Sequence, residues 1–251
     1  MRCVIWAGRS HSRSWPHLLS LTLRNKNLKN KAALFFLAAC FLFALPAQAS
    51  RLKDGDFGVW LRTDFEKKLN SKWKVAIGEN LRFREHQGLY YAETRAGGAY
   101  QPWKNLVLGA DYSQVRNTRE KGKKDIWYWE SRLHFYVTPQ MTVKGWKIED
   151  KNAIDLRGKE AARDSLRYRN MITITAPWKW TRFEIQPYVS DELYFESHRR
   201  GLVENRLYTG VKTRLSESVH ATFYYLRDSV KDSAGGWRDV NIAGTAIKFV
   251  L

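Results

Sequence analysis

From Asp54 onward the sequence divides into segments of about ten residues in which apolar and polar side chains alternate. In one such segment Trp73, Val75 and Ile77 share one face of an extended chain, while Lys74 and Arg82 share the other. Successive side chains of a β-strand project to opposite sides, so a period of two is typical of a strand with two different faces. Helical spacing is not found in this part of the sequence. The pattern therefore predicts an all-β fold.

Two architectures are compatible with this alternation. A soluble β-sandwich would bury the apolar faces and expose the polar ones, whereas a membrane barrel would do the reverse. The polar faces combine arginine with glutamate and tyrosine, which is typical of a small barrel whose side chains pair across the interior. Aromatic residues at the ends of the segments favour the barrel as well, because such residues form girdles at lipid headgroups; they are Trp103, Trp127, Trp178, Trp180, Tyr194 and Trp237.

The predicted connections alternate in length. The short ones are 70–71, 102–105, 138–140, 177–180 and 216–218, and the long ones are 117–124, 150–164, 196–204 and 228–236. Short periplasmic turns and long external loops are characteristic of outer-membrane barrels. We therefore predict an antiparallel up-and-down transmembrane β-barrel of 10–12 strands.

The strand count raises a difficulty. The sequence shows about eleven segments, yet single-chain bacterial barrels have even numbers of strands. We therefore expect either that Phe57 to Phe65 lies outside the cylinder or that one strand is unrecognised, which gives ten or twelve. Pro187 has no N–H to donate to a strand ladder, so a bulge is expected there.

The first part of the chain has the three parts of a secretory signal peptide. Basic residues from Arg24 to Lys31 precede an apolar run from Ala32 to Leu45, which is shorter than the roughly 20 residues of a membrane-spanning helix. Small residues then lead to Ala49, where we predict cleavage. The expected organisation is an extension without a fold (1–23), a signal peptide (24–49) and a barrel domain (50–251). The expected location is the outer membrane of a Gram-negative bacterium.

Both cysteines precede the predicted cleavage site. Leu37 to Cys40 is similar to a lipoprotein acylation motif, but the apolar run continues beyond the cysteine, which favours a plain signal peptide. A mature chain without Cys3 and Cys40 has no disulfide framework. Its net charge would be about +11, since all 25 acidic residues follow the cleavage site.

Residues 237–251 form an alternating segment that is similar to the terminal strand by which outer-membrane barrels are recognised for assembly. Gly244, Ile247, Phe249 and Leu251 are the candidate signal residues, and the barrel-assembly machinery is the implied partner. The basic loop with Lys121, Lys123 and Lys124 would face lipopolysaccharide and other outer-membrane lipid. No nucleic-acid-binding motif is present, and we expect a monomer that binds no nucleic acid.

Several segments together resemble the bacterial domain of unknown function 2490 family. They are Arg167 to Asn170, Pro177 to Glu192, Asn205 to Gly210, Tyr224 to Arg227 and Asp239 to Asn241. The similarity runs from about Asp56 to the end of the chain. It implies an outer-membrane barrel without an assigned activity, and it transfers no catalytic residue.

The inward polar faces would carry a ladder of charges. Its members are Arg82, Arg84, Glu93, Arg95, Glu130, Arg132, Arg167, Arg169, Arg182, Glu184, Arg206 and Arg214. Paired within a small barrel, these side chains would fill the interior. The excess of arginine also permits a narrow, anion-preferring pore. No cofactor is expected, and His86, His134, His198 and His220 lack the spacing of a metal site.

An enzyme is the alternative from another class. His134 shares its face with Glu130 and Arg132 and could act as the base of an outer-membrane lipid hydrolase, but Ser131 projects to the opposite face. Ser165 or Ser190 would have to approach from other strands. A third alternative is a soluble periplasmic β-sandwich that binds an acidic ligand. We expect a structural protein or narrow pore without enzymatic activity.

Overall fold

The computed structural model describes residues 54–251, apart from residues 86, 122–123, 161, 200 and 233 and the side chains of residues 119–125. The predicted signal peptide, the extension before it and both cysteines lie outside the described residues. The described chain forms eleven strands: β1 (Asp56–Lys68), β2 (Trp73–Arg84), β3 (Gly88–Trp103), β4 (Leu106–Lys121), β5 (Lys124–Val143), β6 (Trp146–Lys159), β7 (Ser165–Thr175), β8 (Gln186–Glu196), β9 (Leu202–Arg214), β10 (Val219–Lys231) and β11 (Trp237–Val250).

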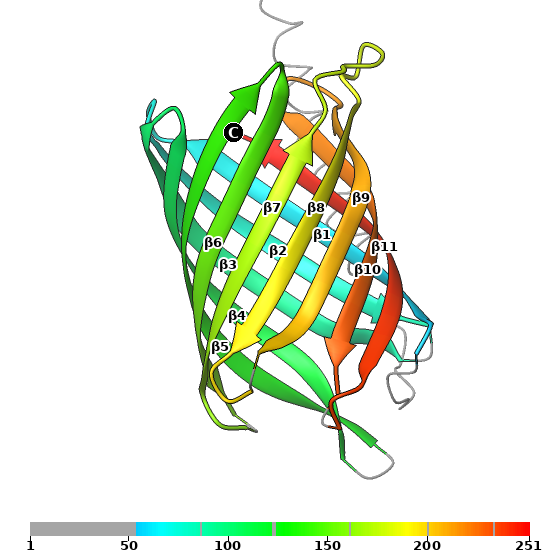
Figure 1. The fold of residues 1–251 in the computed structure, drawn as a ribbon. Helices are drawn as coiled ribbons and strands as arrows, with labels where there is room; N and C mark the ends of the chain where they lie inside the picture. Colours follow the sequence, from blue (N-terminus) through cyan, green and yellow to red (C-terminus); the bar gives the residue numbers. More distant parts are fainter. Residues whose placement is uncertain (1–53, 86, 122–123, 161, 200, 233) are drawn as a thin grey trace, which may run out of the picture. The chain divides into compact units, whose positions relative to one another are not determined.

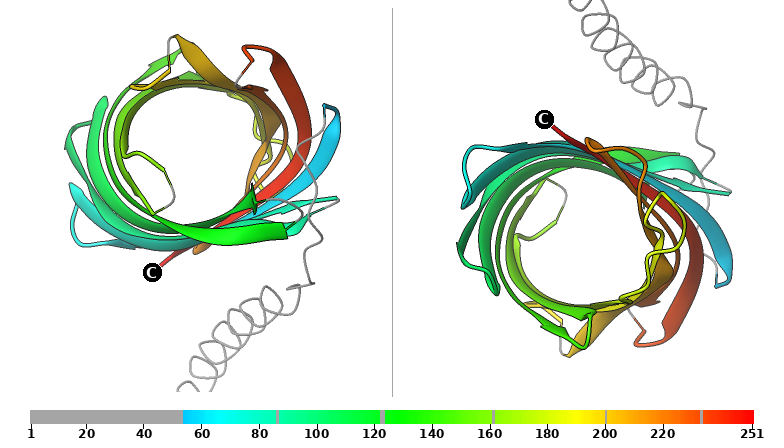
Figure 2. Two further views of the ribbon diagram at one scale, coloured as in Figure 1. Left: turned by 90° about the horizontal axis from the view of Figure 1, so that it is seen from below. Right: turned by 90° about the horizontal axis from the view of Figure 1, so that it is seen from above.

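The strands close into a barrel, which confirms the predicted fold class (Figure 1). Consecutive strands pair antiparallel, and both end-on views show them as a ring (Figure 2). The cylinder closes where β1 and β11 pair in parallel, from Asp56 opposite Val240 to Glu66 opposite Val250. A parallel ladder joins backbone N–H and C=O groups as an antiparallel one does, so it also removes the open edges of the sheet.

The expectation of an even strand count is wrong. The segment from Phe57 to Phe65 is part of β1 and pairs on both sides, with β2 and with β11. Because closure is parallel, eleven strands complete the cylinder, and β1 begins at the opposite end from the one where β11 finishes. We name these ends the N-terminal rim and the C-terminal rim; the C-terminal rim is at the top of Figure 1.

The predicted alternation of loop lengths is also wrong. Residues 138–140 lie inside β5, and most of the predicted loop at 150–164 belongs to β6. The longest connection, residues 176–185, lies at the C-terminal rim with the tight turns. Polar residues in these segments remain paired through their backbones, so the strands continue where the composition resembles that of a loop.

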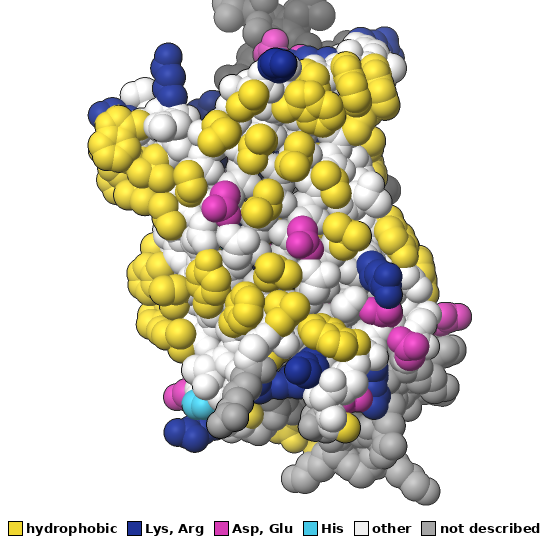
Figure 3. Space-filling model, in the orientation of Figure 1, with side chains coloured by type: hydrophobic (Ala, Val, Ile, Leu, Met, Phe, Trp, Pro, Cys, Tyr) yellow, Lys and Arg dark blue, Asp and Glu magenta, His cyan; other side chains and the backbone are white. Residues whose placement is uncertain are grey.

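The outward face of the barrel is largely apolar. Phe135, Ile172 and Phe223 are each between 45% and 49% exposed. Figure 3 shows such side chains spread over the wall formed by β6 to β9. These are the apolar faces of the alternating segments. In this fold they form the surface of the molecule and not its core.

A few polar side chains interrupt this outer wall. Asn170 Nδ2 donates to Asp150 Oδ1 over 2.6 Å and to Asn152 Oδ1 over 3.1 Å, and Asn205 Nδ2 donates to Asp191 Oδ1 over 2.6 Å. Acidic side chains are visible among the apolar ones in Figure 3. Asp150 and Asp191 therefore each have an amide partner on a neighbouring strand.

The aromatic residues at the rims were mostly predicted correctly. Trp103, Trp178, Trp180 and Trp237 are each between 46% and 65% exposed. Tyr194 was misassigned, because its side chain is fully buried inside the barrel. It shares strand parity with Glu192 on β8, and that face is directed inward.

Three further expectations concern β8. Pro187 is the second residue of the strand and pairs with Val211 without a bulge; the register shift lies at Tyr194 and Phe195. A proline near the start of a strand removes no essential ladder bond. The predicted strand positions of Arg182 and Glu184 are wrong, since both belong to the turn that precedes β8.

Glycines make room for large inward side chains. A Cβ added to Gly244 would collide with the ring of Tyr224, and one added to Gly109 would collide with the ring of Tyr136. Gly244 is therefore directed into the barrel. Ile247, Phe249 and Leu251 have the opposite strand parity, so the four candidate signal residues do not share one face.

A small apolar core lies inside the barrel beside the parallel seam. Trp60, Leu226, Val240 and Ile242 are each at most 4% exposed, and Tyr208 and Tyr224 pack against them. These residues come from β1, β9, β10 and β11. The seam is thus supported by apolar packing as well as by its backbone ladder.

Candidate functional site: the charged lumen

The lumen contains a network of buried ion pairs on β5 to β9. Glu130, whose side chain is 3% exposed, accepts hydrogen bonds from two arginines. Arg157 donates through Nε over 2.6 Å and through Nη2 over 2.9 Å, and Arg132 Nη2 donates over 2.8 Å. Two-point guanidinium contacts of this kind are strong and hold both side chains in fixed positions.

Asp155 is the second centre of this network. Its carboxylate is fully buried and accepts from Arg167 Nε at 2.9 Å and Nη2 at 2.7 Å. His134 Nδ1 lies 2.5 Å from the other carboxylate oxygen, and Arg169 Nε lies 3.5 Å from Oδ2. One acid on β6 thus holds two arginines of β7 and a histidine of β5.

Arg206 and Tyr194 connect this network to the seam. Arg206 Nη1 donates to the hydroxyl of Tyr194 over 2.5 Å, and the same guanidinium contacts Glu204 at 2.5 Å and Asp228 at 3.3 Å. It also lies over the ring of Trp60, at 4.8 Å from the ring centroid. The charges therefore extend to the apolar core without a gap between the two.

Arg82 is held differently from the other lumen arginines. Its guanidinium carbon lies 3.8 Å from the ring centroid of Trp60 and 4.1 Å from that of Tyr91. Among the described residues no carboxylate is within 4 Å of it, and its Nε has no hydrogen-bond partner. Stacking on two aromatic rings compensates part of the desolvation of this cation.

Two cavities inside the barrel are lined by described residues. The larger, of about 690 Å³, lies at the C-terminal rim and is named the vestibule; the smaller, of about 460 Å³, lies deeper. The vestibule is hollow because the inward residues around it are small: Ala76, Gly97, Ala99, Thr222 and Ala246. Arg62, Arg95 and Lys151 border both cavities.

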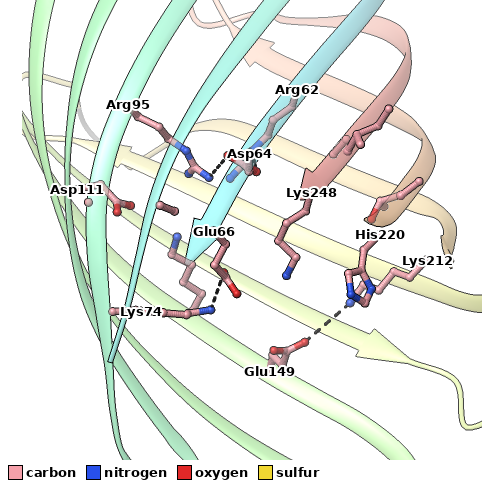
Figure 4. Close-up of a pocket in the computed structure, with 18 of the residues that line it drawn as sticks. Arg62, Asp64, Glu66, Lys74, Arg95, Asp111, Glu149, Lys212, His220 and Lys248 are labelled. Atoms are coloured by element: carbon pink, nitrogen blue, oxygen red, sulfur yellow. Dashed lines mark hydrogen bonds and ion pairs between the residues drawn. The ribbon is translucent and has the colours of Figure 1, made fainter. Parts of the chain in front are cut away.

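Charged side chains line the vestibule (Figure 4). On one wall Lys74 pairs with Glu66 at 3.0 Å, and Arg95 and Arg62 share Asp64 at 2.7 and 2.8 Å. Other walls carry further pairs, Lys147 with Glu149 at 2.8 Å and Arg214 with Glu184 at 3.5 Å. The Glu184 carboxyl is at the exposed mouth, where the hydrogen bond and charge of Lys179 lower its pKa.

The structure brings together many of the predicted ladder residues. Those that lie in the network or line the two cavities are Arg82, Glu93, Arg95, Glu130, Arg132, Arg167, Arg169 and Arg206. Arg84 stacks on Tyr90 at 4.0 Å. Arg214 and Glu184 lie at the vestibule mouth, and Arg182 lies on the turn against Phe183.

Sequence reasoning missed several lumen residues. Asp155 and Arg157 lay in the segment that was assigned to a long loop, and Tyr194 was assigned to the outer girdle. Lys248 lies among the apolar residues of the terminal strand, and only Gly244 and apolar residues were predicted to be functional there. The alternation continues through both segments and was the signal that could have found them.

The hydrolase hypothesis requires a nucleophile beside His134. Ser131 lies outside and bonds to Gln114, Ser165 bonds to Lys159 and Glu196, and Ser190 donates to the carbonyl of Ile172. The ring nitrogens of His134 contact Asp155 and Arg169. In the described part of the chain no serine hydroxyl contacts this histidine.

Two other features are absent from the described residues. No group of three or more histidine, cysteine, aspartate or glutamate side chains is placed to hold a metal ion. Within the same residues there is no helix long and apolar enough to cross a bilayer.

The sequence of residues 57–239 matches a family described as protein of unknown function (DUF2490). The chain belongs to this family. The match covers β1 to β10 and the beginning of β11, so it includes nearly the whole barrel and the charged lumen. The family resemblance deduced from the sequence is thereby confirmed. Comparisons with curated proteins and with solved structures gave no match.

Proposed function

We propose that this DUF2490 barrel is an integral outer-membrane protein whose lumen is blocked by ion pairs, so that it acts as a structural or binding protein and not as an open channel. The observation that carries the proposal is the inversion of a soluble fold: large apolar side chains are exposed on the outside of a closed cylinder, and charges are buried within it. The apolar outer face is stable in lipid, and the closed barrel keeps the charged inner face away from it.

The outer wall supports this location. Soluble proteins rarely expose contiguous apolar surface on such a scale. Tryptophans at the rims fit the headgroup region, and Asp150 and Asp191 of the outer wall are hydrogen bonded to asparagines. A signal peptide at 24–49, contact with lipopolysaccharide and insertion by the barrel-assembly machinery are parts of the same proposal.

The interior supports the blocked state. Buried side chains of Glu130, Asp155 and Arg167 are bound to partners on neighbouring strands, and the buried ring of Tyr194 lies 5.0 Å from the guanidinium carbon of Arg167. Opening a path through this network would separate buried charges, which costs several kcal/mol for each broken pair.

A narrow, anion-preferring pore is the second candidate. It is favoured by three lumen cations, Arg82, Lys151 and Lys248, for which no acid lies within 4 Å among the described residues. The Lys151 ammonium lies 4.1 Å from the centroid of the Tyr136 ring. Two of these cations border the deeper cavity, where a permeating anion would have to pass.

The location is tested by placing a charge on the outer wall. Phe135→Arg puts a cation in the middle of β5, where lipid contact would reduce the free energy of unfolding by about 2–4 kcal/mol. Leu69→Arg is the control, because Leu69 is 57% exposed on the turn after β1. Heat-modifiable migration and recovery in the outer-membrane fraction should be lost or reduced for the first variant alone. Equal tolerance of both substitutions would contradict the membrane location.

Conductance in planar bilayers separates the blocked barrel from the pore. The blocked barrel should give no steady current at high protein loading. Anion-selective steps that decrease in Arg82→Gln would instead establish the second candidate.

A further inference from the structure

The vestibule has one wall that is basic across three strands. Arg214 on β9 pairs in register with His220 on β10, and His220 pairs with Lys248 on β11. All three side chains line the cavity, as does Lys212, one inward position deeper on β9. Figure 4 shows Lys212, His220 and Lys248 extending into the same space.

This wall is poorly neutralised by the protein itself. Arg214 has Glu184 at 3.5 Å, and Lys212 has Glu149 only at 3.8 Å. For Lys248 and His220 the described residues provide neither an ion pair nor a hydrogen bond. Arg214 and Lys248 thus lie on either side of His220, and protonation of this histidine would place like charges at directly opposed cross-strand positions, which is unfavourable.

The space in front of the row is large enough for a ligand. Small residues, among them Thr222 and Ala246 beside the row, leave a cavity of about 690 Å³. Cavities of roughly 300–1,000 Å³ hold organic ligands. An inorganic ion alone would leave most of this volume to water.

We propose that the vestibule binds a phosphorylated compound, with its phosphate held by Lys248, His220 and Lys212. A phosphate group carries close to two negative charges and three terminal oxygens, which suits three separate donors better than a single planar carboxylate does. Lysine binds phosphate as a point charge and needs no fixed fork geometry. The proposal requires the closed barrel but not its location in a membrane.

The phosphate could be free in solution or part of a lipid headgroup. Both sources share the same chemistry, and two probes distinguish them: inorganic pyrophosphate, and mixed micelles that contain phosphatidic acid. Binding of both probes indicates that the site recognises the phosphate group whether it is free or attached to a lipid. Binding of the phosphatidic acid micelles alone indicates that the ligand is a lipid. Either result supports the site when phosphatidylcholine micelles do not bind.

The test uses the mature chain folded in neutral detergent and titrated calorimetrically. Saturable binding is expected for the unmodified protein. The affinity should fall at least tenfold in the double variant Lys248→Gln and His220→Gln, and it should be largely retained in Lys248→Arg. Lys104→Gln is the matched control, because it removes one lysine charge from a turn at the same rim outside the vestibule. It should bind like the unmodified protein.

Two results would overturn the site. One is the absence of saturation by either probe up to about 10 mM, which corresponds to less than about 3 kcal/mol of binding free energy. The other is equal affinity in the double variant. Heat-modifiable migration of each variant is recorded first, so a lost site is distinguished from a lost barrel, and the membrane location is tested separately by Phe135→Arg.

Discussion

The lumen has two walls of opposite character. Beside the parallel seam, Trp60, Leu226, Val240 and Ile242 form an apolar core, whereas the wall from β5 to β8 is held by Glu130, Asp155 and their arginines. The residues of both walls are shielded from the outside of the barrel. The difference shows that a barrel interior can be stabilised either by removing apolar surface from water or by fixing charges in pairs, and that one chain can use both.

The division follows the geometry of closure. Tyr224 lies between Gly210 and Gly244 and extends across the seam-side wall, where a side chain on either glycine would collide with it or with its backbone. The charged wall instead needs long side chains that reach partners on strands two positions away, as Arg157 does toward Glu196. Small residues and aromatic rings serve the first wall, and arginines serve the second.

The largest expected effect is on the charged wall. Asp155→Leu leaves Arg167 and Arg169 buried beside an apolar group, and we expect the free energy of unfolding to fall by about 3–5 kcal/mol. Urea unfolding of the folded barrel in detergent measures it. Asp150→Leu on the same strand is the control, since its carboxylate faces outward, and a change within about 1 kcal/mol is expected. Similar losses of unfolding free energy in both variants would show that the buried network contributes no more to stability than an outward carboxylate does.

The apolar wall should respond slightly less. Leu226→Ala removes a fully buried side chain from the seam core, with an expected loss of about 3 kcal/mol in the free energy of unfolding. Leu207→Ala, 45% exposed on the outer face of β9, should lose about 1 kcal/mol. If the outward leucine proved the more important of the two, the seam core would not be what holds that wall.

A smaller effect is expected at Gly244, which leaves space for the ring of Tyr224. Gly244→Ala places a methyl group against the ring of Tyr224 and should reduce the free energy of unfolding by about 1–3 kcal/mol. In a Tyr224→Ala background the same change should be close to neutral, because the obstacle is gone. Additive losses in the double variant would contradict the proposed contact.

The smallest effect concerns a pair outside both walls. Lys179 Nζ donates to Glu184 over 2.6 Å at the exposed turn and lowers the pKa of that carboxyl. Lys179→Gln should raise the pKa of Glu184 toward its ordinary value, as followed by NMR titration, with stability almost unchanged. Any stabilisation from a lowered carboxyl pKa is present above the unfolded-state pKa and is lost as the pH falls through the folded-state pKa. An unchanged pKa in the variant would exclude Lys179 as the cause.

Alternation alone predicted the most robust features of the fold. Period two identifies the faces, so the outward position of Phe135 and the inward positions of Glu130, Arg132 and His134 followed from parity. Whether the polar face is enclosed depends on closure, and the aromatic residues at the rims gave the correct answer. Errors arose where composition was weighted above parity, as for Tyr194 and for the β6 segment.

The remaining features depend on contacts between distant strands. Parity places Asp155 and Arg167 inside but does not say that they bond, because pairing depends on the register of β6 with β7. Strand direction leaves no trace in an alternating pattern, so a parallel contact between β1 and β11 could not be read from either strand. The hollow at the C-terminal rim arises from small residues on different strands and becomes visible only when those strands are assembled.

The parallel seam also has a consequence for engineering. In an even-stranded cylinder the first and last strands finish side by side, so a few residues can reconnect them and new termini can be cut elsewhere. Here a linker from the end of β11 to the start of β1 would have to run the full height of the cylinder, on the order of 30 Å for eleven paired residues on tilted strands. Circular permutants with short tethers should therefore fail to assemble, and reporter domains fused to the start of β1 and the end of β11 would be held at opposite rims of the cylinder.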